Sequence, residues 1–287
     1  MEPLITFIVT YHNEPEAFLQ ACLESIQALP LRVDEVEILV VDDGSEVLPT
    51  FSGKAGIRYI RQEQAGLSAA RNKGIRYSQG QYLQFVDADD YIFPAVYEKV
   101  LEQIRDNNPD LVLFKMTKKA AKATKCTSKN TSGPHFLQHH NLRAAAWGYA
   151  FKREILDDLR FYPGIFHEDE LFTPQIFLRA NTLVDLDAKA YFYRQHEGTI
   201  THSKSSDKVR KRLDDIHFAL RELRALDNPL LKRRIRQLTL DYLQRIWTLT
   251  HSPRELRRRK KELRKEGFLP LPVRFYSLRY FLASLFE

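Results

Sequence analysis

Short apolar runs that alternate with helix-like segments constrain the fold of this chain more than any other feature. The runs are "LITFIVT" at 4–10, "VEILVVD" at 36–42, "IRYI" at 57–60 and "YLQFVD" at 82–87. Strands rich in consecutive Val, Ile and Leu are typical of parallel sheets that helices cover on both faces. Residues 15–28 and 66–77 show helical periodicity between them. The pattern predicts an α/β fold with a doubly wound, mostly parallel sheet of the Rossmann-like kind.

Length and composition fit a globular protein with a large core. Of 287 residues, 44% are apolar and 28% are charged, which is ordinary for a soluble protein. Cys22 and Cys126 lie far apart without metal-ligand spacing, so we expect reduced thiols rather than a disulfide or a zinc site. No secretory signal pattern precedes the first run, and no stretch reaches the roughly 20 apolar residues of a membrane span. These features predict a cytoplasmic protein that does not cross a bilayer.

Polar residues follow three of the apolar runs, at the point where each predicted strand ends. They are "TYHNE" at 10–14, "DDGS" at 42–45 and "DADD" at 87–90. The carboxyl ends of parallel strands meet at one edge of the sheet, where the ligands of such folds bind. The carboxylates of Asp87, Asp89 and Asp90 repel one another unless a cation, hydrogen-bond donors or water surround them. The sequence predicts a binding site at this edge, with a solvated acidic turn as the alternative.

A second D-x-D pair shows that this spacing alone is not specific. Asp185 and Asp187 lie in the alternating run "TLVDLDAKAYFY", where both side chains would share one face of a strand. We interpret this second pair as a solvated strand edge.

The segment "EQAGLSAARNKGI" at 63–75 combines a glycine at a helix entry with an arginine about one turn later. Gly66 would let a ligand approach the backbone, and the planar guanidinium of Arg71 could clamp a phosphate oxygen. A helix start packed through alanines, with Arg71 at the surface, is the alternative. The chain has neither G-x-G-x-x-G after its first strand nor a P-loop, which argues against a dinucleotide dehydrogenase and a P-loop NTPase.

The order of these motifs resembles that of the family 2 inverting glycosyltransferases of the GT-A fold, of the bacterial capsular or cell-surface polysaccharide type. The resemblance rests on "TFIVTYHNE", "VVDDGS", "AGLSAARNKGI", "FVDADD" and "FHEDELF", and it covers about residues 4–200. It implies a hexosyltransferase that moves a sugar from a nucleotide diphosphate, in the first place UDP, to a saccharide or a lipid-linked saccharide.

The resemblance also implies roles for residues at the sheet edge. The positions that it places on the nucleotide are Thr10, Tyr11, Glu14, Asp42, Asp43, Arg71 and Asp87. Asp89 would meet a divalent cation that bridges the diphosphate, and His196, with Arg194 as a second candidate, would reach the cation or the diphosphate. Mn²⁺ or Mg²⁺ is expected because such ions take oxygen ligands and commonly use one or two carboxylates together with phosphates.

The motif "GIFHEDELF" at 164–172 is where the resemblance places the general base. Displacement at a sugar carbon needs a base on the face opposite the leaving group. Asp169 matches that position, with Glu168 beside it near the acceptor, and a helix beginning here would hold the carboxylate at its positive end. An acidic first turn that only complements the helix dipole is the alternative. The resemblance places an acceptor sugar near Trp147, which is equally plausible as a core residue.

The last third of the chain is strongly basic and carries no motif that the resemblance explains. Residues 208–265 contain 19 Lys and Arg against 7 Asp and Glu, a surplus of 12 positive charges. Helical spacing predicts helices at 205–226, 229–250 and 252–267, followed by an aromatic-rich end. We therefore divide the chain into a catalytic domain, 1–204, and a basic helical region, 205–287. An anchor to the anionic inner membrane surface is one interpretation; packing on the catalytic domain or on a second subunit of a homodimer is the other.

Two other functions fit parts of the sequence less well. A sugar-phosphate nucleotidyltransferase should carry a basic, glycine-rich loop after its first strand, whereas "YHNEPE" is acidic. A protein that binds nucleic acid through the basic tail would need aromatic side chains on a positive groove across the core, and the acidic strand ends argue against one. We therefore expect no nucleic-acid partner.

Overall fold

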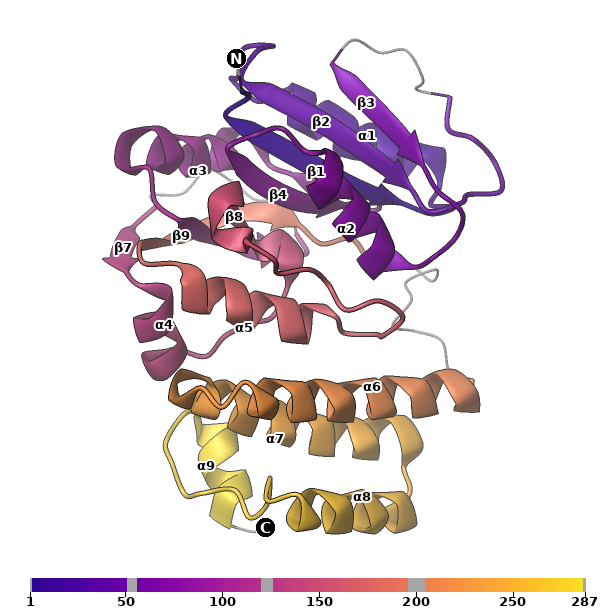
Figure 1. Ribbon diagram of the computed structural model, residues 1–287, viewed down its shortest axis with the longest axis vertical. Helices are drawn as coiled ribbons and strands as arrows, with labels where there is room; N and C mark the ends of the chain where they lie inside the picture. The colour runs from indigo at the N-terminus through magenta and orange to yellow at the C-terminus, as the bar shows by residue number, and fades with distance from the viewer. Residues whose placement is uncertain (1, 51–55, 120–125, 196–204, 286–287) are drawn as a thin grey trace.

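The computed structural model describes residues 2–50, 56–119, 126–195 and 205–285, and these form one nine-stranded sheet with helices on both faces and a helical layer at one end (Figure 1). The first part contains β1 (Ile5–Tyr11), α1 (Glu16–Gln27), β2 (Val36–Asp42), β3 (Ile57–Arg61), α2 (Leu67–Tyr77) and β4 (Tyr82–Asp87). It continues with β5 (Tyr91–Ile92), α3 (Pro94–Asn107), β6 (Leu111–Thr117), β7 (Ser128–Thr131), α4 (Gly133–His139), β8 (Tyr149–Lys152), α5 (Asp169–Arg179) and β9 (Leu183–Phe192). Short 3₁₀ helices lie at Ala146–Gly148, Arg153–Leu156 and Pro229–Leu231.

The strand order is β3-β2-β1-β4-β8-β6-β9-β5, with β7 paired to β9. The predicted α/β class is confirmed, and β2 and β4 span the residues expected of them. The expectation of a mostly parallel sheet holds for the half from β3 to β4, where every pairing is parallel. The other half is mixed, because β8 pairs antiparallel with both β4 and β6 and the two short strands β5 and β7 pair antiparallel with β9.

The parallel strands are buried on both faces, as their composition predicts. Along β1, Phe7 and Val9 pack on the face covered by α1 and α3, whereas Ile8 packs on the face covered by α2 and α5. α2 lies very close to the sheet, because a Cβ added at Gly74 would be 2.3 Å from a methyl carbon of Ile8. The helices that cover the sheet thereby fix the direction in which the strand ends point.

The C-terminal region consists of α6 (Ser206–Ala225), α7 (Lys232–Thr250), α8 (Pro253–Lys265) and α9 (Leu278–Leu285). In Figure 1, α6 and α7 lie beneath α4 and α5, and α8 and α9 are farther from the sheet. One apolar cluster runs without interruption from Phe85 and Phe172 of the sheet-containing part to Leu220 and Leu238 of the helical region. The helical region therefore packs on the sheet-containing part, as one of the two interpretations of the tail expects.

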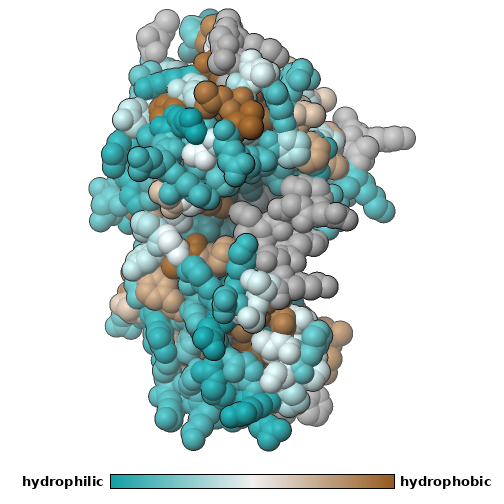
Figure 2. Space-filling view, turned by 90° about the vertical axis from the view of Figure 1, so that its right-hand side faces the viewer, coloured by the Kyte–Doolittle hydropathy of each residue, from teal (hydrophilic) through white to brown (hydrophobic). Residues whose placement is uncertain are grey.

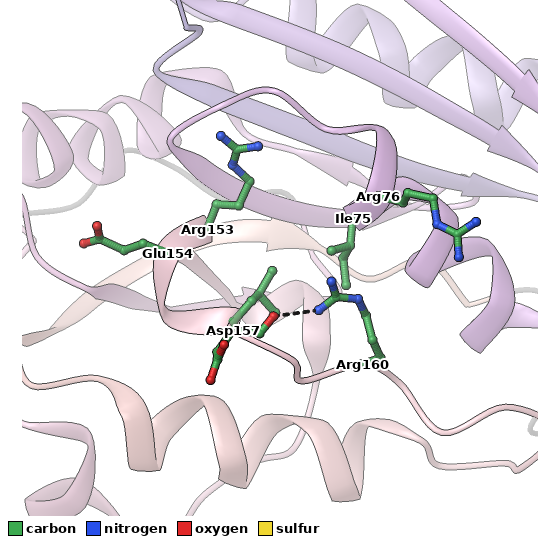
Figure 3. A pocket seen from close by; sticks show the side chains of 7 residues that line it. Ile75, Arg76, Arg153, Glu154, Asp157 and Arg160 are labelled. Carbon is green, nitrogen blue, oxygen red and sulfur yellow. Dashed lines mark hydrogen bonds between the residues drawn. The ribbon is translucent and has the colours of Figure 1, made fainter.

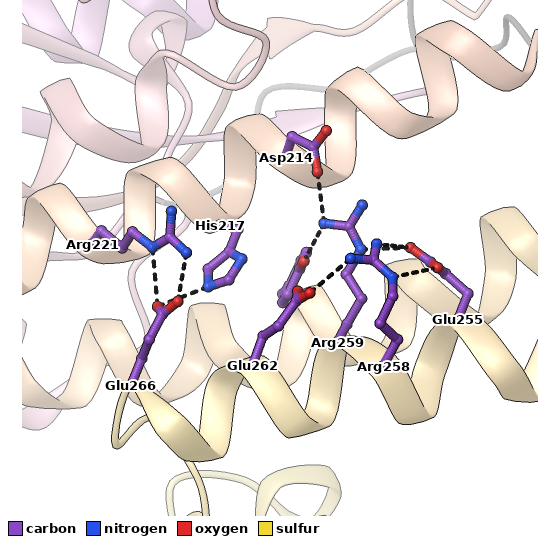
Figure 4. A network of polar contacts seen from close by, with 9 residues as sticks. Asp214, His217, Arg221, Glu255, Arg258, Arg259, Glu262 and Glu266 are labelled. Atoms are coloured by element: carbon purple, nitrogen blue, oxygen red, sulfur yellow. Dashed lines mark hydrogen bonds and ion pairs between the residues drawn. The ribbon is translucent and has the colours of Figure 1, made fainter.

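Arg258 and Arg259 of α8 form ion pairs inside the helical region (Figure 4). Arg259 is buried, donates to the Tyr242 hydroxyl over 2.8 Å and pairs with Asp214 over 2.8 Å. Glu266, just after α8, accepts from His217 over 2.9 Å and pairs with Arg221 of α6. These contacts hold α8 against α6 and α7. No helix of the described residues is both long and apolar enough to cross a bilayer.

Candidate active site

The three polar segments that follow β1, β2 and β4 meet at one edge of the sheet, as expected. The strand register places Tyr11 beside Asp42 and Thr10 beside Asp87. The amide of Asp43 donates to the Tyr11 carbonyl over 2.9 Å, and the amide of Ala88 donates to the Thr10 carbonyl over 3.1 Å. Thr10 and Tyr11 are themselves buried, so the strand β1 forms the floor of this edge.

Asp42 and Asp43 are buried and use their carboxylates to build the surrounding turns. Asp42 accepts from the amide and hydroxyl of Ser45, over 2.8 and 2.6 Å, and from the hydroxyl of Tyr59. Burial alone would raise the pKa of Asp42, but these hydrogen bonds and the charge of Arg61 hold it below its ordinary value. Asp43 accepts from the backbone amides of residues 65 and 66, both over 2.8 Å. Asp42 thus shapes the turn after β2, and Asp43 holds the loop between β3 and α2.

Glu14 lies half-buried beside the D-x-D segment. Its carboxylate accepts from the amide of His12 over 2.5 Å. Burial raises the pKa of Glu14, and the nearby charges of Asp89 and Asp87 act in the same direction. The end of β1 and the end of β4 therefore contribute carboxylates to one common cluster.

Asp90 is the buried member of that cluster and is 1% exposed. Its Oδ1 accepts from the amide of Arg194 over 2.7 Å, whereas its Oδ2 has no hydrogen-bond partner in the part of the chain that the structure describes. Burial, together with the charges of Asp87 and Asp89, raises the pKa of Asp90 to about 8. Arg194 also donates to the Asp89 carbonyl over 2.7 Å and lies over Phe18, so it fixes this turn.

Arg71 joins the D-x-D segment to the start of α5. One guanidinium nitrogen donates to Asp87 over 2.9 Å and the other donates to Glu168 over 2.5 Å. The Arg71 side chain is 3% exposed and lies over the rings of Phe85 and Phe161. In this arrangement Arg71 is not open to a phosphate oxygen, contrary to the expectation of a phosphate clamp, because two carboxylates already occupy both terminal nitrogens.

Three consecutive acidic residues begin α5, as expected of a helix that starts near Asp169. Glu168 pairs with Arg71, and Glu170 pairs with Arg234 of α7. Asp169 lies between them, half-buried, and its carboxylate forms no hydrogen bond or ion pair with any other described residue. Burial, then the charges of Glu168 and Glu170, raise the pKa of Asp169 well above its ordinary value. Glu168, expected near the acceptor, is instead buried in the ion pair.

Trp147 is a core residue, which decides between the two interpretations of its ring. It is 7% exposed and stacks on Tyr191 with ring centroids 4.5 Å apart. Its burial argues against the expected contact with an acceptor sugar. Trp147 is followed by β8, which pairs with β4, and then by the short 3₁₀ helix Arg153–Leu156.

Arg143 is a cation at this site that sequence reasoning missed. It lies over Trp147, 5.1 Å from the ring centroid, and its side chain is exposed. Partial burial lowers the pKa of Arg143, and the neighbouring Tyr193 and Asp169 oppose that shift. No salt bridge joins Arg143 to another described residue. Nothing in its local sequence signals this position, because its neighbours come from other strands and helices.

The carboxylates at this edge fit a divalent cation held partly by a substrate. No three His, Cys, Asp or Glu side chains of the described ranges are grouped as a ready-made metal site. Mg²⁺ and Mn²⁺ often use only one or two carboxylates with phosphate oxygens and water. Asp87, 27% exposed, and the half-buried Asp89 are oxygen ligands of that kind. His196, the other expected ligand, lies outside the described residues.

The second D-x-D pair and a charged hollow both lie apart from this edge. Asp187 on β9 is exposed and pairs with Lys115 over 2.6 Å, so the predicted solvation is confirmed. The expected strand edge is wrong, because β9 pairs with β6 on one side and with β7 on the other. A hollow of about 460 Å³ is lined by Arg76, Arg153 and Arg160, among others (Figure 3). It lies at the end of α2 and beside the start of β4, at the opposite edge of the sheet. Its position separates it from the carboxylate cluster.

Comparison with known proteins assigns a family to this arrangement. The family model for glycosyl transferase family 2 matches residues 6–161, more than half of the chain. The glycosyltransferase EpsJ of Bacillus subtilis is 30% identical over 222 residues, which are 70% of this chain and 64% of EpsJ. The chain belongs to glycosyl transferase family 2, which argues against the nucleotidyltransferase alternative, and it spans less than two thirds of the length of EpsJ.

Solved structures support the same fold. Residues 1–349 of TarS of Staphylococcus aureus, in complex with UDP-GlcNAc, superpose with a TM-score of 0.67 at 19% identity, over 99% of this chain and 80% of that TarS fragment. The mannosyltransferase PcManGT of Pyrobaculum calidifontis in complex with GDP-Man and Mn²⁺ superposes with a TM-score of 0.59 at 15% identity, over 100% of this chain and 87% of PcManGT. The fold is therefore the GT-A fold, and the helical region is included in both superpositions.

The different surroundings of Arg71 and Arg143 predict different effects on stability. Arg71→Met leaves the carboxylate of Glu168 buried without a cation, so we expect a loss of about 3 to 5 kcal/mol in the free energy of unfolding. Arg143→Met removes an exposed charge, and we expect a change within about 0.5 kcal/mol. Urea unfolding of both variants measures this difference. Equal stability of the two would contradict the bridging role of Arg71.

Proposed function

We propose that the protein is a metal-dependent, inverting glycosyltransferase that moves a hexose from a UDP-sugar to a saccharide or lipid-linked saccharide in the synthesis of a cell-surface polysaccharide. The observation that carries the proposal is the carboxylate of Asp169. It has no cation partner among the described residues and is joined through Glu168 and Arg71 to the D-x-D edge. The complexes of TarS with UDP-GlcNAc and of PcManGT with GDP-Man and Mn²⁺ support a nucleotide-sugar donor and a divalent cation.

The nucleotide would lie over the ends of β1, β2 and β4. Thr10 and Tyr11 form the floor, and the turns built by Asp42 and Asp43 shape the wall beside the base and ribose. Glu14 and Asp87 would complete the wall from the neighbouring segments. Asp89, with Asp87 beside it, would hold Mn²⁺ or Mg²⁺, and His196 stays a proposed further ligand. When bound, such a cation stabilises the departing diphosphate as a Lewis acid.

Arg143 is the better candidate for a contact with the diphosphate than Arg71. A guanidinium that is exposed and close to the carboxylate edge can take part in a bidentate contact with phosphate oxygens. Arg71 instead acts on the geometry of the site, because it fixes Asp87 and Glu168 relative to each other.

Asp169 would act as the general base. Its Oδ takes the proton of the acceptor hydroxyl while the acceptor oxygen forms a bond to the anomeric carbon. The bond from that carbon to the diphosphate oxygen breaks on the opposite side, so the configuration is inverted. A carboxylate whose pKa is raised accepts a proton more readily than an ordinary one, which suits a base that works near neutral pH.

The end of the helical region would meet an anionic membrane on the cytoplasmic side. Exposed apolar side chains gather in the last part of the chain, namely Trp247, Val273, Phe275, Leu278 and Leu282. Arg274 and Arg279 are exposed between them, and α8 adds further exposed basic residues. In Figure 2 the lower part of the molecule is mainly hydrophilic with small apolar patches near one edge. Basic and apolar residues in this combination favour peripheral binding to anionic lipid, where a lipid-linked acceptor is also found.

Asp169→Asn should reduce transfer about 10² to 10⁴ fold, because an amide cannot take the proton. The affinity for UDP in the presence of Mn²⁺ should stay unchanged. Turnover of nucleotide sugars chosen by a thermal-shift screen measures the first quantity, and calorimetry measures the second. Asp187→Asn is the matched control, because Asp187 is exposed on β9, away from the sheet edge. Full turnover by Asp169→Asn would remove this residue from the mechanism.

Asp89→Ala should abolish the part of UDP binding that depends on Mn²⁺, because it removes an oxygen ligand next to the diphosphate. Titration of UDP with Mn²⁺ and with a chelator separates that part from the rest. Asp185→Ala, in the second D-x-D pair, is expected to bind like the unchanged protein. Intact Mn²⁺-dependent affinity in Asp89→Ala would refute the assignment of this ligand.

The chain should co-sediment with phosphatidylglycerol vesicles at low salt and much less with phosphatidylcholine vesicles. Phe275→Ser combined with Leu278→Ser should weaken the binding severalfold, since both apolar side chains are exposed. Added salt should release the protein, because screening weakens its attraction to anionic lipid. Failure of the unchanged chain to bind anionic vesicles at low salt would exclude this part of the proposal.

A further inference from the structure

The loop that leads into α5 is held from one side by the C-terminal helices. The contacts come from two side chains of α6 and two side chains of α7. Lys211 donates to the Gly164 carbonyl over 2.7 Å, Asp215 accepts from the Phe166 amide over 2.8 Å, Arg245 donates to His167 Nε2 over 3.1 Å, and Arg234 pairs with Glu170. Figure 1 shows α5 lying along α6. The backbone and the side chains of this loop are thus both anchored to the helical region.

His167 needs this support, because its backbone φ of 60° is unfavourable for a residue with a side chain. Its imidazole accepts from Arg245 and must be neutral to do so. Burial, then the charges of Arg245 and Arg212, lower the pKa of His167 to about 3, so the ring stays neutral over the physiological range. The strained residue directly before the acidic triplet is therefore fixed by α7.

The acidic triplet Glu168, Asp169 and Glu170 receives one arginine from each half of the protein. Arg71 on α2 neutralises Glu168, and Arg234 on α7 neutralises Glu170. Arg234 is buried, and its other terminal nitrogen donates to the Leu142 carbonyl over 3.0 Å, so its position is fixed independently of the triplet. Without Arg234, the charge of Glu170 would be uncompensated next to Asp169.

We propose that Arg234 is a positioning residue for the reaction: through Glu170 it holds the first turn of α5 and sets the charge that surrounds Asp169, so that α7 completes the active site. The proposal rests on the role of Asp169 as the base. This role of Arg234 differs from membrane binding by the tail. Here the face of the helical region that packs on α5 acts directly on the reaction.

The charged and titratable groups that face Asp169 come from four elements and one loop. They are Glu168 and Glu170 of α5, Arg71 of α2, Arg234 of α7, Tyr149 of β8 and Arg143 of the segment before it. After burial, the two glutamates raise the pKa of Asp169 while Arg71 and Arg234 lower it. The Glu170–Arg234 pair can be changed without altering the segment that contains the D-x-D residues or its partner Arg71.

Removing the two members of this pair should shift the titration of Asp169 in opposite directions. Arg234→Met removes a positive charge, so Asp169 should become protonated at a higher pH. Glu170→Gln removes a negative charge, so Asp169 should become protonated at a lower pH. The double variant should return close to the unchanged protein, and Arg234→Lys, which keeps the charge, should lie near it as well. Arg233→Met is the matched control, since Arg233 contacts α4 and the following residues instead.

The titration can be followed without any substrate, from the stability of each protein relative to its Asp169→Asn counterpart. The folded pKa of Asp169 is raised above the unfolded value of about 4. Aspartate therefore contributes stability, relative to asparagine, that is present below the unfolded pKa and is lost as the pH rises through the folded pKa. The pH at which this loss of stability is complete should be higher in Arg234→Met and lower in Glu170→Gln, by about one pH unit or more.

Two outcomes separate this inference from the proposed function. Identical titrations in all variants, or shifts in the same direction for both single variants, would overturn the role of Arg234, whatever the activity. Shifts in opposite directions, combined with full turnover by Asp169→Asn, would leave the coupling intact and overturn the base assignment. If Arg234→Met does not fold, two other results still test the inference. Asp169 should titrate at a lower pH in Glu170→Gln, and close to the pH of the unchanged protein in Arg234→Lys. With an active donor, the acidic limb of kcat should follow the same order.

Discussion

The ion pairs of Arg71 are the interaction on which the geometry of the site depends. Asp87 ends a strand of the sheet and Glu168 precedes a helix 81 residues later in the chain, and a single buried guanidinium joins them. A buried charge is tolerated only where good partners surround it, and here two carboxylates and two aromatic rings do so. The distance between the end of β4 and the start of α5 is therefore set by a single buried arginine.

The parts of the fold that could be predicted are those that follow from local patterns. The runs that became β2 and β4 are apolar on both faces, and parallel pairing then brings Asp42, Asp43 and Asp87 to one edge without further information. The direction of the Arg71 side chain could not be predicted, because its partner Glu168 lies 97 residues away. The burial of Trp147 depends likewise on Tyr191, which comes from a distant strand. Long-range pairing decides both cases.

The basic tail shows why a surplus of charge is a weak guide to function. Arg234, Arg259 and Arg221 all contribute to the positive count, yet each pairs with a carboxylate within the protein. Arg234 and Arg259 are buried as well. A count of charges does not show which of them are paired. The surplus therefore suggested an external polyanion, although some of these residues form ion pairs within the protein. The exposed basic residues of α8 and the apolar end of the chain are what is left for a membrane.

The acidic triplet at the start of α5 reconciles two opposite demands on Asp169 as the proposed general base. A carboxylate without a partner is a better proton acceptor, and burial strengthens that tendency, but a pKa raised too far would leave Asp169 protonated and inactive at neutral pH. Each pKa unit corresponds to about 1.4 kcal/mol, so a single well-placed arginine can decide the protonation state. Neutralising the two neighbours while leaving Asp169 unpaired meets both demands. One arginine belongs to α2, which covers the sheet, and the other belongs to α7 of the helical region, so the packing of these two parts determines the surroundings of the proposed base.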